Sequence, residues 1–151
     1  MNYPPIEQLL PHTGPAVLID AVREHHKDSI HVTARITDNH PFFVTGRGVP
    51  VWVGIEMMAQ AVAAYSGLEG SHSGGQPREG MLLGTRRYHG YVAWFEAGQT
   101  LDIHAQAAFG QIGTMGACQC HIDSQGTRLA EATILIVERE PQPATNTSQT
   151  P

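Results

Sequence analysis

Charged residues are scarce in this chain of 151 residues, because Asp, Glu, Lys and Arg together make up only 15% of it. A typical soluble domain has about 25%. Hydrophobic residues make up 41%, which is enough for a core and excludes a chain that is disordered throughout. A domain with so few charges has little charged surface to present to water, so we expect an obligate oligomer.

An excess of positive charge is also absent. Lys and Arg total 9 against 14 Asp and Glu, which gives a formal net charge of -5. Proteins that bind nucleic acid need clustered Lys and Arg to neutralise phosphates, so we expect no nucleic-acid partner. Histidine, by contrast, is abundant at 9 residues, so the net charge should change strongly between about pH 5 and pH 7.

Cysteine and long apolar runs are both rare. Cys118 and Cys120 stand two apart, which on a strand places both side chains on one face, poorly placed to bond each other. We predict small buried hydrophobic side chains rather than a disulfide or a metal site. No apolar run reaches about 18 residues, and residues 1–5 lack the pattern of a signal peptide. We expect a cytoplasmic protein with no membrane partner.

Several motifs that carry chemistry are missing. The chain has no His-Glu-x-x-His or Cys-x-x-Cys pattern, no Gly-x-Ser-x-Gly elbow and no glycine-rich loop with phosphate-binding spacing. Because these motifs are absent, the sequence offers little support for metal, nucleophilic-serine or nucleotide chemistry. We therefore expect no metal and no cofactor.

The pattern of the chain predicts one domain over residues 1–140 and a disordered polar tail over residues 141–151. Residues 29–37 alternate between apolar and polar, as in a half-buried strand. Residues 53–68 are rich in helix formers and apolar nearly all round, as in a helix wrapped by other structure. Further β-rich segments and connections complete the prediction: a strand beginning near residue 16, a loop at 69–79, strands at 80–89, 100–109, 113–123 and 127–138, and a hairpin turn at 124–126.

This order implies an α+β fold in which an antiparallel sheet wraps around a single helix. One sheet covers a helix on one side only. We therefore expect a second subunit to close the other side.

Two polar residues interrupt the apolar helix. Glu56 and Gln60 stand four residues apart, on one face, where they can touch. In apolar surroundings desolvation would raise the pKa of Glu56, which suits a general acid or base. The structural alternative, given equal weight, is that Glu56 complements the helix dipole from the first turn.

Two residues precede this pair at the start of the helix. The backbone N–H groups near Gly54 could hold a carbonyl oxygen, although close packing explains a glycine there equally well. Trp52 would fix the direction in which the chain enters the helix. A tryptophan at such a position is more often a core or interface residue than a ligand contact.

Among the histidines, His40 precedes Pro-Phe-Phe in the loop before the helix, so it could reach the same cavity as Glu56. A histidine in a surface turn is the commoner situation. We expect His12 to be a turn residue and His25 and His26 to be solvated, and the sequence leaves the role of His89 open.

Two motifs resemble the 3-hydroxyacyl-(acyl carrier protein) dehydratases of the hotdog fold. They are Asn-His-Pro-Phe-Phe at residues 39–43 and Gly-Ile-Glu-Met-Met-Ala-Gln-Ala at residues 54–61. The Leu-Leu-Pro-His opening at residues 9–12 is similar to the start of these enzymes. Residues 50–56 more specifically resemble a divergent branch linked to aryl polyene pathways. The likeness spans about residues 5–138.

The resemblance implies a dimeric hotdog protein that acts on a β-hydroxyacyl thioester carried by the phosphopantetheine arm of an acyl carrier protein. In the family, a histidine removes the C2 proton and a helix carboxylate protonates the leaving hydroxyl, usually across a dimer. Glu56 matches the carboxylate, Gly54 the glycine that polarises the thioester carbonyl, and Gln60 the helix glutamine, which we expect to orient Glu56. The histidine of the family's Gly-His-Phe-Pro motif is missing from residues 44–48.

Three hypotheses therefore stand. The chain is a dehydratase that uses Glu56 with a relocated histidine, for which His40 is the nearest substitute and His12 more remote. Alternatively, it is a non-catalytic subunit that stabilises a catalytic hotdog partner, or an acyl-thioester hydrolase. The non-catalytic subunit implies a heterodimer with another hotdog protein, whereas the two enzyme hypotheses allow either a homodimer or a heterodimer.

Carrier proteins are usually acidic, so docking to this acidic chain needs a local basic patch. Arg86 and Arg87, with Arg47 or Arg78 near them, are the candidates. Ordinary surface arginines are the simpler explanation.

Overall fold

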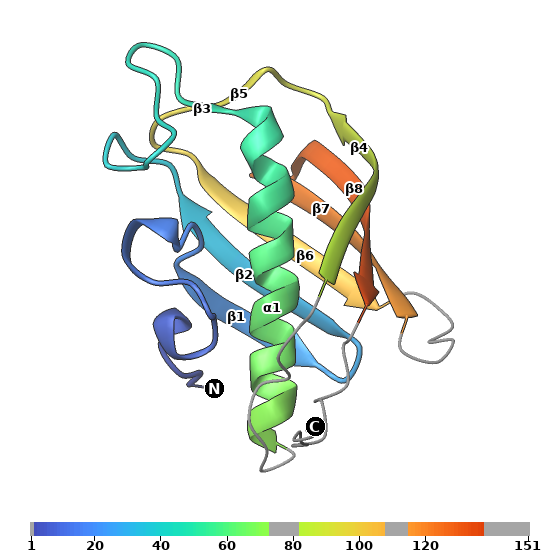
Figure 1. Ribbon diagram of the computed structural model, residues 1–151. Helices are drawn as coiled ribbons and strands as arrows, with labels where there is room; N and C mark the ends of the chain where they lie inside the picture. Colours follow the sequence, from blue (N-terminus) through green and yellow to red (C-terminus); the bar gives the residue numbers. More distant parts are fainter. Residues whose placement is uncertain (1, 73–81, 108–114, 138–151) are drawn as a thin grey trace, which may run out of the picture.

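The computed structural model describes residues 2–72, 82–107 and 115–137 (Figure 1). The predicted tail, the end of the predicted loop at 69–79 and Arg78 lie outside the described residues. The strands are β1 (Ala21–His26), β2 (Ser29–Arg35), β3 (Val49–Pro50), β4 (Leu82–Gly90), β5 (Trp94–Phe95), β6 (Thr100–Ala107), β7 (Met115–Ser124) and β8 (Thr127–Val137). The helices are α1 (Gly54–His72) and three short 3-10 turns, η1 (Ile6–Gln8), η2 (Gly14–Ala16) and η3 (Val51–Val53).

Six strands form one sheet in the order β1-β2-β6-β7-β8-β4, and every neighbouring pair is antiparallel. Helix α1 crosses one face of this sheet (Figure 1) and packs most extensively on β6 and β2. The α+β prediction is therefore confirmed. Two short strands, β3 and β5, pair with each other beside the start of α1 and were not predicted, because two residues are too few to show a period.

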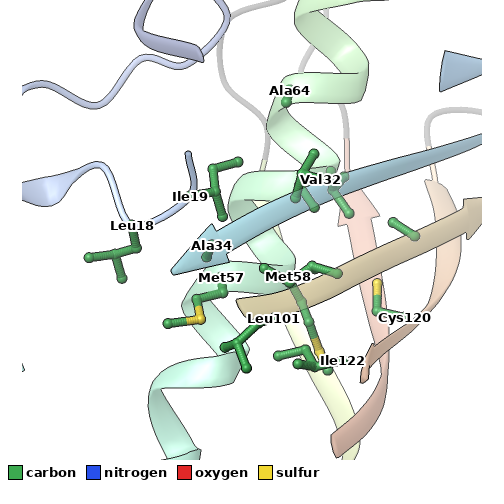
Figure 2. Close-up of a cluster of buried hydrophobic side chains, with 14 of the residues drawn as sticks. Leu18, Ile19, Val32, Ala34, Met57, Met58, Ala64, Leu101, Cys120 and Ile122 are labelled. Atoms are coloured by element: carbon green, nitrogen blue, oxygen red, sulfur yellow. The ribbon is translucent and has the colours of Figure 1, made fainter. Parts of the chain in front are cut away.

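The core lies between α1 and the sheet. In β2 the predicted inward residues Ile30, Val32 and Ala34 are all buried, because side chains alternate between the two faces of a strand. Figure 2 shows Met57 and Met58 of α1 among side chains of the strands. Cys118 and Cys120 are both buried, and neither forms a disulfide. This agrees with the prediction of small buried side chains.

The helix is buried nearly all round within this one chain. The sheet covers one side, and part of the other side is covered by the N-terminal segment, which contributes five buried residues, Ile6, Leu9, Leu10, Leu18 and Ile19. Close contact is enforced at Gly67 of α1, where an added Cβ would lie 3.2 Å from the Cα of Leu9. Along this stretch of α1 the cover comes from the same chain, because the N-terminal segment folds back onto the helix.

The helix also runs further than predicted. It continues through Glu69 to His72, where the sequence pattern predicted the start of a loop. His25 explains part of this extension, since its Nε2 lies 2.8 Å from the Glu69 carboxylate. The His25 side chain is only 9% exposed, so the expectation that it is solvated was wrong.

The hairpin predicted at residues 124–126 joins β7 to β8. Gln125 and Gly126 both have positive φ, 49° and 80°, as a two-residue turn with the twist of the flanking strands requires. None of the described helices is long and apolar enough to cross a membrane.

Candidate functional site

A cavity of about 620 Å³ opens beside the start of α1, a size typical of small-molecule sites. Three segments of the chain build it: the N-terminal loop with η2, the loop before β3, and η3 with the first turn of α1. Its wall is formed by His12, Pro15, Ala16, Leu18, Pro41, Phe42, Trp52, Val53, Ile55 and Glu56. Among these residues the polar side chains are those of His12 and Glu56, so the cavity is an apolar space with two groups able to move protons.

Gln60 holds together the part of the cavity wall that is formed by Ala16, Leu18 and Glu56. Its side chain is fully buried, and its Oε1 accepts the backbone N–H of Leu18 at 2.8 Å. Its Nε2 donates to the carbonyl oxygen of Ala16 at 2.7 Å and to Oε1 of Glu56 at 3.2 Å. One amide therefore ties the N-terminal loop to α1 and also contacts the carboxylate, as the four-residue spacing predicted.

His12 reaches the same carboxylate from the N-terminal loop. Its Nε2 lies 3.2 Å from Oε1 of Glu56. Its Nδ1 is buried and has no hydrogen-bond partner among the described residues. His12 lies in a loop bracketed by Pro11 and Pro15, which restrict the backbone on both sides. The imidazole and the carboxylate thus form a pair at the cavity wall.

The Glu56 side chain is 49% exposed in the isolated chain. The expectation of a fully desolvated carboxylate is therefore not met by this chain alone, because the wall around Glu56 is open on one side. Glu56 also lies in the first turn of α1, where a negative charge complements the helix dipole. Both interpretations of this residue fit its position.

Trp52 and Phe42 form the outer rim of the cavity. Their rings meet edge to face with centroids 5.6 Å apart, yet Trp52 remains 58% exposed and Phe42 43% exposed. Large apolar side chains exposed together mark an interaction surface. Trp52 thus lies where a ligand or a second subunit would cover it.

His40 lies behind the rim rather than in the wall. Its Nδ1 accepts the backbone N–H of Phe42 at 3.1 Å, and its Nε2 is buried with no hydrogen-bond partner in the described part of the chain. Burial lowers the pKa of His40, with the Asp20 carboxylate acting in the opposite direction. The structure places His12, and not His40, against Glu56, because the N-terminal loop folds over the start of α1.

Gly54 lies on the opposite side of the helix start. An added Cβ would collide with the Tyr88 hydroxyl and lie 3.2 Å from Cζ of Phe95. The Gly54 N–H already donates to the carbonyls of Val51 and Trp52 at the end of η3. This geometry favours the close-packing explanation of the glycine over a free carbonyl-binding N–H.

Arg86 and Arg87 lie on β4, one of the two edge strands of the six-stranded sheet. A bulge interrupts the pairing of β4 with β8 between Arg86 and His89, and Arg87 within it has a φ of 55°. The Arg87 side chain is exposed. Arg47 lies over the ring of Trp94 at 5.6 Å, so its guanidinium already has a partner. The side chain of Arg86 lies outside the described residues.

Three comparisons with known proteins relate this geometry to other molecules. The dehydratase heterocomplex ApeI:P from Xenorhabdus doucetiae contains a chain that is 27% identical, with a TM-score of 0.84 over 92% of this chain and 93% of that one. Cj0977, a sigma28-regulated virulence protein from Campylobacter jejuni, is 15% identical, with a TM-score of 0.65 over 90% and 96%.

A hypothetical thioesterase with coenzyme A from Streptococcus pneumoniae TIGR4 is 13% identical, with a TM-score of 0.58 over 80% and 85% of the two chains. These last two likenesses concern the fold alone, which is the predicted hotdog fold. No curated protein matches. The family model described as ApeP-like, ApeP dehydratase, matches residues 4–148, which is most of the chain. The chain belongs to the ApeP-like dehydratase family.

Proposed function

We propose that this chain is a dehydratase subunit that removes water from 3-hydroxyacyl thioesters carried on an acyl carrier protein, in aryl polyene or fatty acid type biosynthesis. One observation carries the proposal: the Glu56 carboxylate faces an apolar cavity and lies 3.2 Å from the His12 imidazole. Membership of the ApeP-like dehydratase family supports the reaction type.

Dehydration needs a base and an acid at neighbouring positions. The base removes a proton from C2, the C2–C3 double bond forms, and the C3–O bond breaks. The hydroxyl leaves as water with a proton from the acid. In this site His12 is the base and Glu56 the acid, and the contact between them returns the proton from His12 to Glu56 after each turnover.

The rest of the cavity suits the acyl chain. Apolar side chains dominate its wall, and apolar ligands bind such walls because burial removes their surface from water. Gln60 holds the carboxylate in place and does not contact solvent. The exposed Arg87 on the edge strand is a docking contact for the acidic carrier protein in this proposal.

A second hotdog protein completes the site in this proposal. Glu56 is half exposed and the Trp52–Phe42 rim is uncovered, so the chain by itself does not exclude water. The similar chain from Xenorhabdus doucetiae comes from a dehydratase heterocomplex. This supports a heterodimer in which the partner covers the rim.

One alternative is a subunit that stabilises a catalytic partner without contributing a reacting group. The missing histidine of the Gly-His-Phe-Pro motif supports it. The two functions differ in what His12 does. Under the alternative, His12 and Glu56 are replaceable as long as the complex assembles.

The test is turnover of a 3-hydroxyacyl carrier protein by the chain alone and with its hotdog partner, followed by mass spectrometry. We expect the enoyl product from the complex and a large loss of rate in His12→Asn. His40→Asn separates the two histidines, and His26→Asn, at an exposed position on β1, is the matched control. Full activity of His12→Asn in the assembled complex would refute the role of His12, and release of free thiol instead of enoyl product would indicate a hydrolase.

A further inference from the structure

A row of titratable side chains crosses the sheet at one level. The strand registers pair His31 with His104 and His104 with His121, so β2, β6 and β7 each place one histidine at the same height. We call these three residues the histidine row. Its outer neighbours in register are Glu24 on β1 and Glu131 on β8.

The histidine row lies on the face of the sheet that α1 does not cover. The residues on either side of His104 in β6, Ile103 and Ala105, are buried in the core. Because side chains alternate along a strand, His104 points to the opposite face. His31 and His121 share that face through their register. The cavity beside Glu56 is formed by other segments of the chain, so this is a separate place in the molecule.

The three imidazoles are stacked. The His31 and His104 ring centroids are 4.3 Å apart at an interplanar angle of 16°, and those of His104 and His121 are 4.6 Å apart at 24°. Asp123, two residues after His121, brings its Oδ2 to 3.6 Å from His121 Nε2. One ligand atom each from His104, His121 and Asp123 can be chosen so that all three lie within 4.8 Å of one another.

We infer that His104, His121 and Asp123 form a binding site for a divalent transition-metal ion, with Zn²⁺ as the best fit. Imidazole and carboxylate are the ligand types that Zn²⁺ accepts, at about 2.0–2.2 Å. Ligand atoms in a tetrahedral site lie about 3.3 Å apart, so small side-chain rotations bring these three together. Mg²⁺ and Ca²⁺ prefer sites made of oxygen ligands and should not compete.

The surrounding residues support this assignment. His31 Nε2 lies 2.8 Å from Oδ1 of Asp102, which holds in place the ring that stacks on the proposed ligand His104. Burial and the neighbouring imidazoles lower the pKa of His104, and burial together with the Arg128 charge lowers the pKa of His121. Neutral imidazole is the form that binds a metal ion.

Arg128 acts against metal binding. Its Nε donates to Oδ1 of Asp123 at 2.7 Å, and its Nη1 to Oε1 of Glu131 at 3.2 Å. This leaves Oδ2 of Asp123, the oxygen nearer His121, for the metal ion. Removal of the Arg128 charge should therefore strengthen binding, an effect that a general affinity of histidines for metal ions would not produce.

The test is a titration of the untagged full chain with Zn²⁺ by calorimetry, followed by Co²⁺ absorption spectroscopy as a report on ligand type. We expect one saturable site, binding at least about tenfold weaker in His104→Gln and in His121→Gln, and tighter binding in Arg128→Gln. The matched control is His26→Gln, because His26 Nε2 also lies near a carboxylate, 3.7 Å from Glu24, but outside the row. Its affinity should equal that of the native chain.

A second measurement does not depend on the folding of any variant. Substoichiometric Cu²⁺ added to the native chain should broaden the imidazole resonances of His104 and His121, together with that of His31 stacked on His104, before those of the other histidines. No saturable Zn²⁺ binding, equal binding in the His104, His121 and His26 variants, or broadening that begins at His12 would overturn the inference.

Discussion

The replacement Gln60→Leu should destabilise the protein and disturb the site together. Leucine has a similar size but can neither accept the Leu18 N–H nor donate to Ala16 and Glu56. Leu18 is buried, so its N–H would be left without a partner, at a cost of about 1–3 kcal/mol. Ala16 and Glu56 are exposed, so water can replace the bonds to them at little cost.

The expected loss is therefore about 2 kcal/mol of unfolding free energy, or about 4–8 °C in Tm for a domain of this size. Urea unfolding followed by circular dichroism measures it, and the denaturant slope should stay unchanged while the midpoint falls. Gln106→Leu is the control, because Gln106 is exposed on β6. Equal midpoints for the two variants would refute the role given to the Gln60 amide.

Three further results are expected. Gly54→Ala should cost about 1–3 kcal/mol by overpacking, measured by urea unfolding, while Gly84→Ala, whose Cβ meets an atom only at 3.9 Å, should cost less. Because burial lowers the pKa of His40, the unfolded chain binds more protons near pH 6, so stability falls as the pH drops below about 6.5; His40→Asn should flatten that slope. Burial raises the pKa of Cys118 to about 11, so iodoacetamide at pH 8 should label it only in urea.

The main elements of the fold could be predicted because their hydrophobic patterns are long. Strand β2 shows a clear alternation, and α1 contains no proline over many residues with high helix propensity. The end of the helix could not be predicted. Its last turn includes Gly70, a poor helix former, but the Glu69 carboxylate in it contacts His25 of a distant strand. Tertiary contacts of this kind have no signal in the local sequence.

The candidate site was predicted in part. Glu56 and Gln60 followed from helical spacing, and their contact is observed. Sequence separation favours His40 over His12 as the partner of Glu56, because His40 is nearer to Glu56 along the chain, but sequence separation says little about distance in the fold. A hint was available: two prolines close to His12 favour an ordered loop, and Leu9 and Leu10 before it need an apolar surface to cover.

The histidine row had no sequence signal for the same reason. Metal motifs such as His-Glu-x-x-His place two ligands on one helix turn, whereas His104 and His121 come together through the register of two antiparallel strands. Only the pairing of β6 with β7 reveals that they are neighbours. The expectation of no metal follows from helix and loop motifs, and such motifs carry no information on ligands that lie on neighbouring strands of a sheet.

The most direct test of the proposed function is the turnover number of the assembled hotdog complex with Glu56→Gln in this chain and an unaltered partner. Glutamine keeps the size of the side chain and can still contact Gln60, so assembly should persist, which size-exclusion chromatography would verify. We predict a loss of dehydration of at least about a hundredfold, the usual contribution of a general acid. Turnover equal to that of the native complex would contradict a catalytic role for this chain and leave it as a subunit that supports its partner.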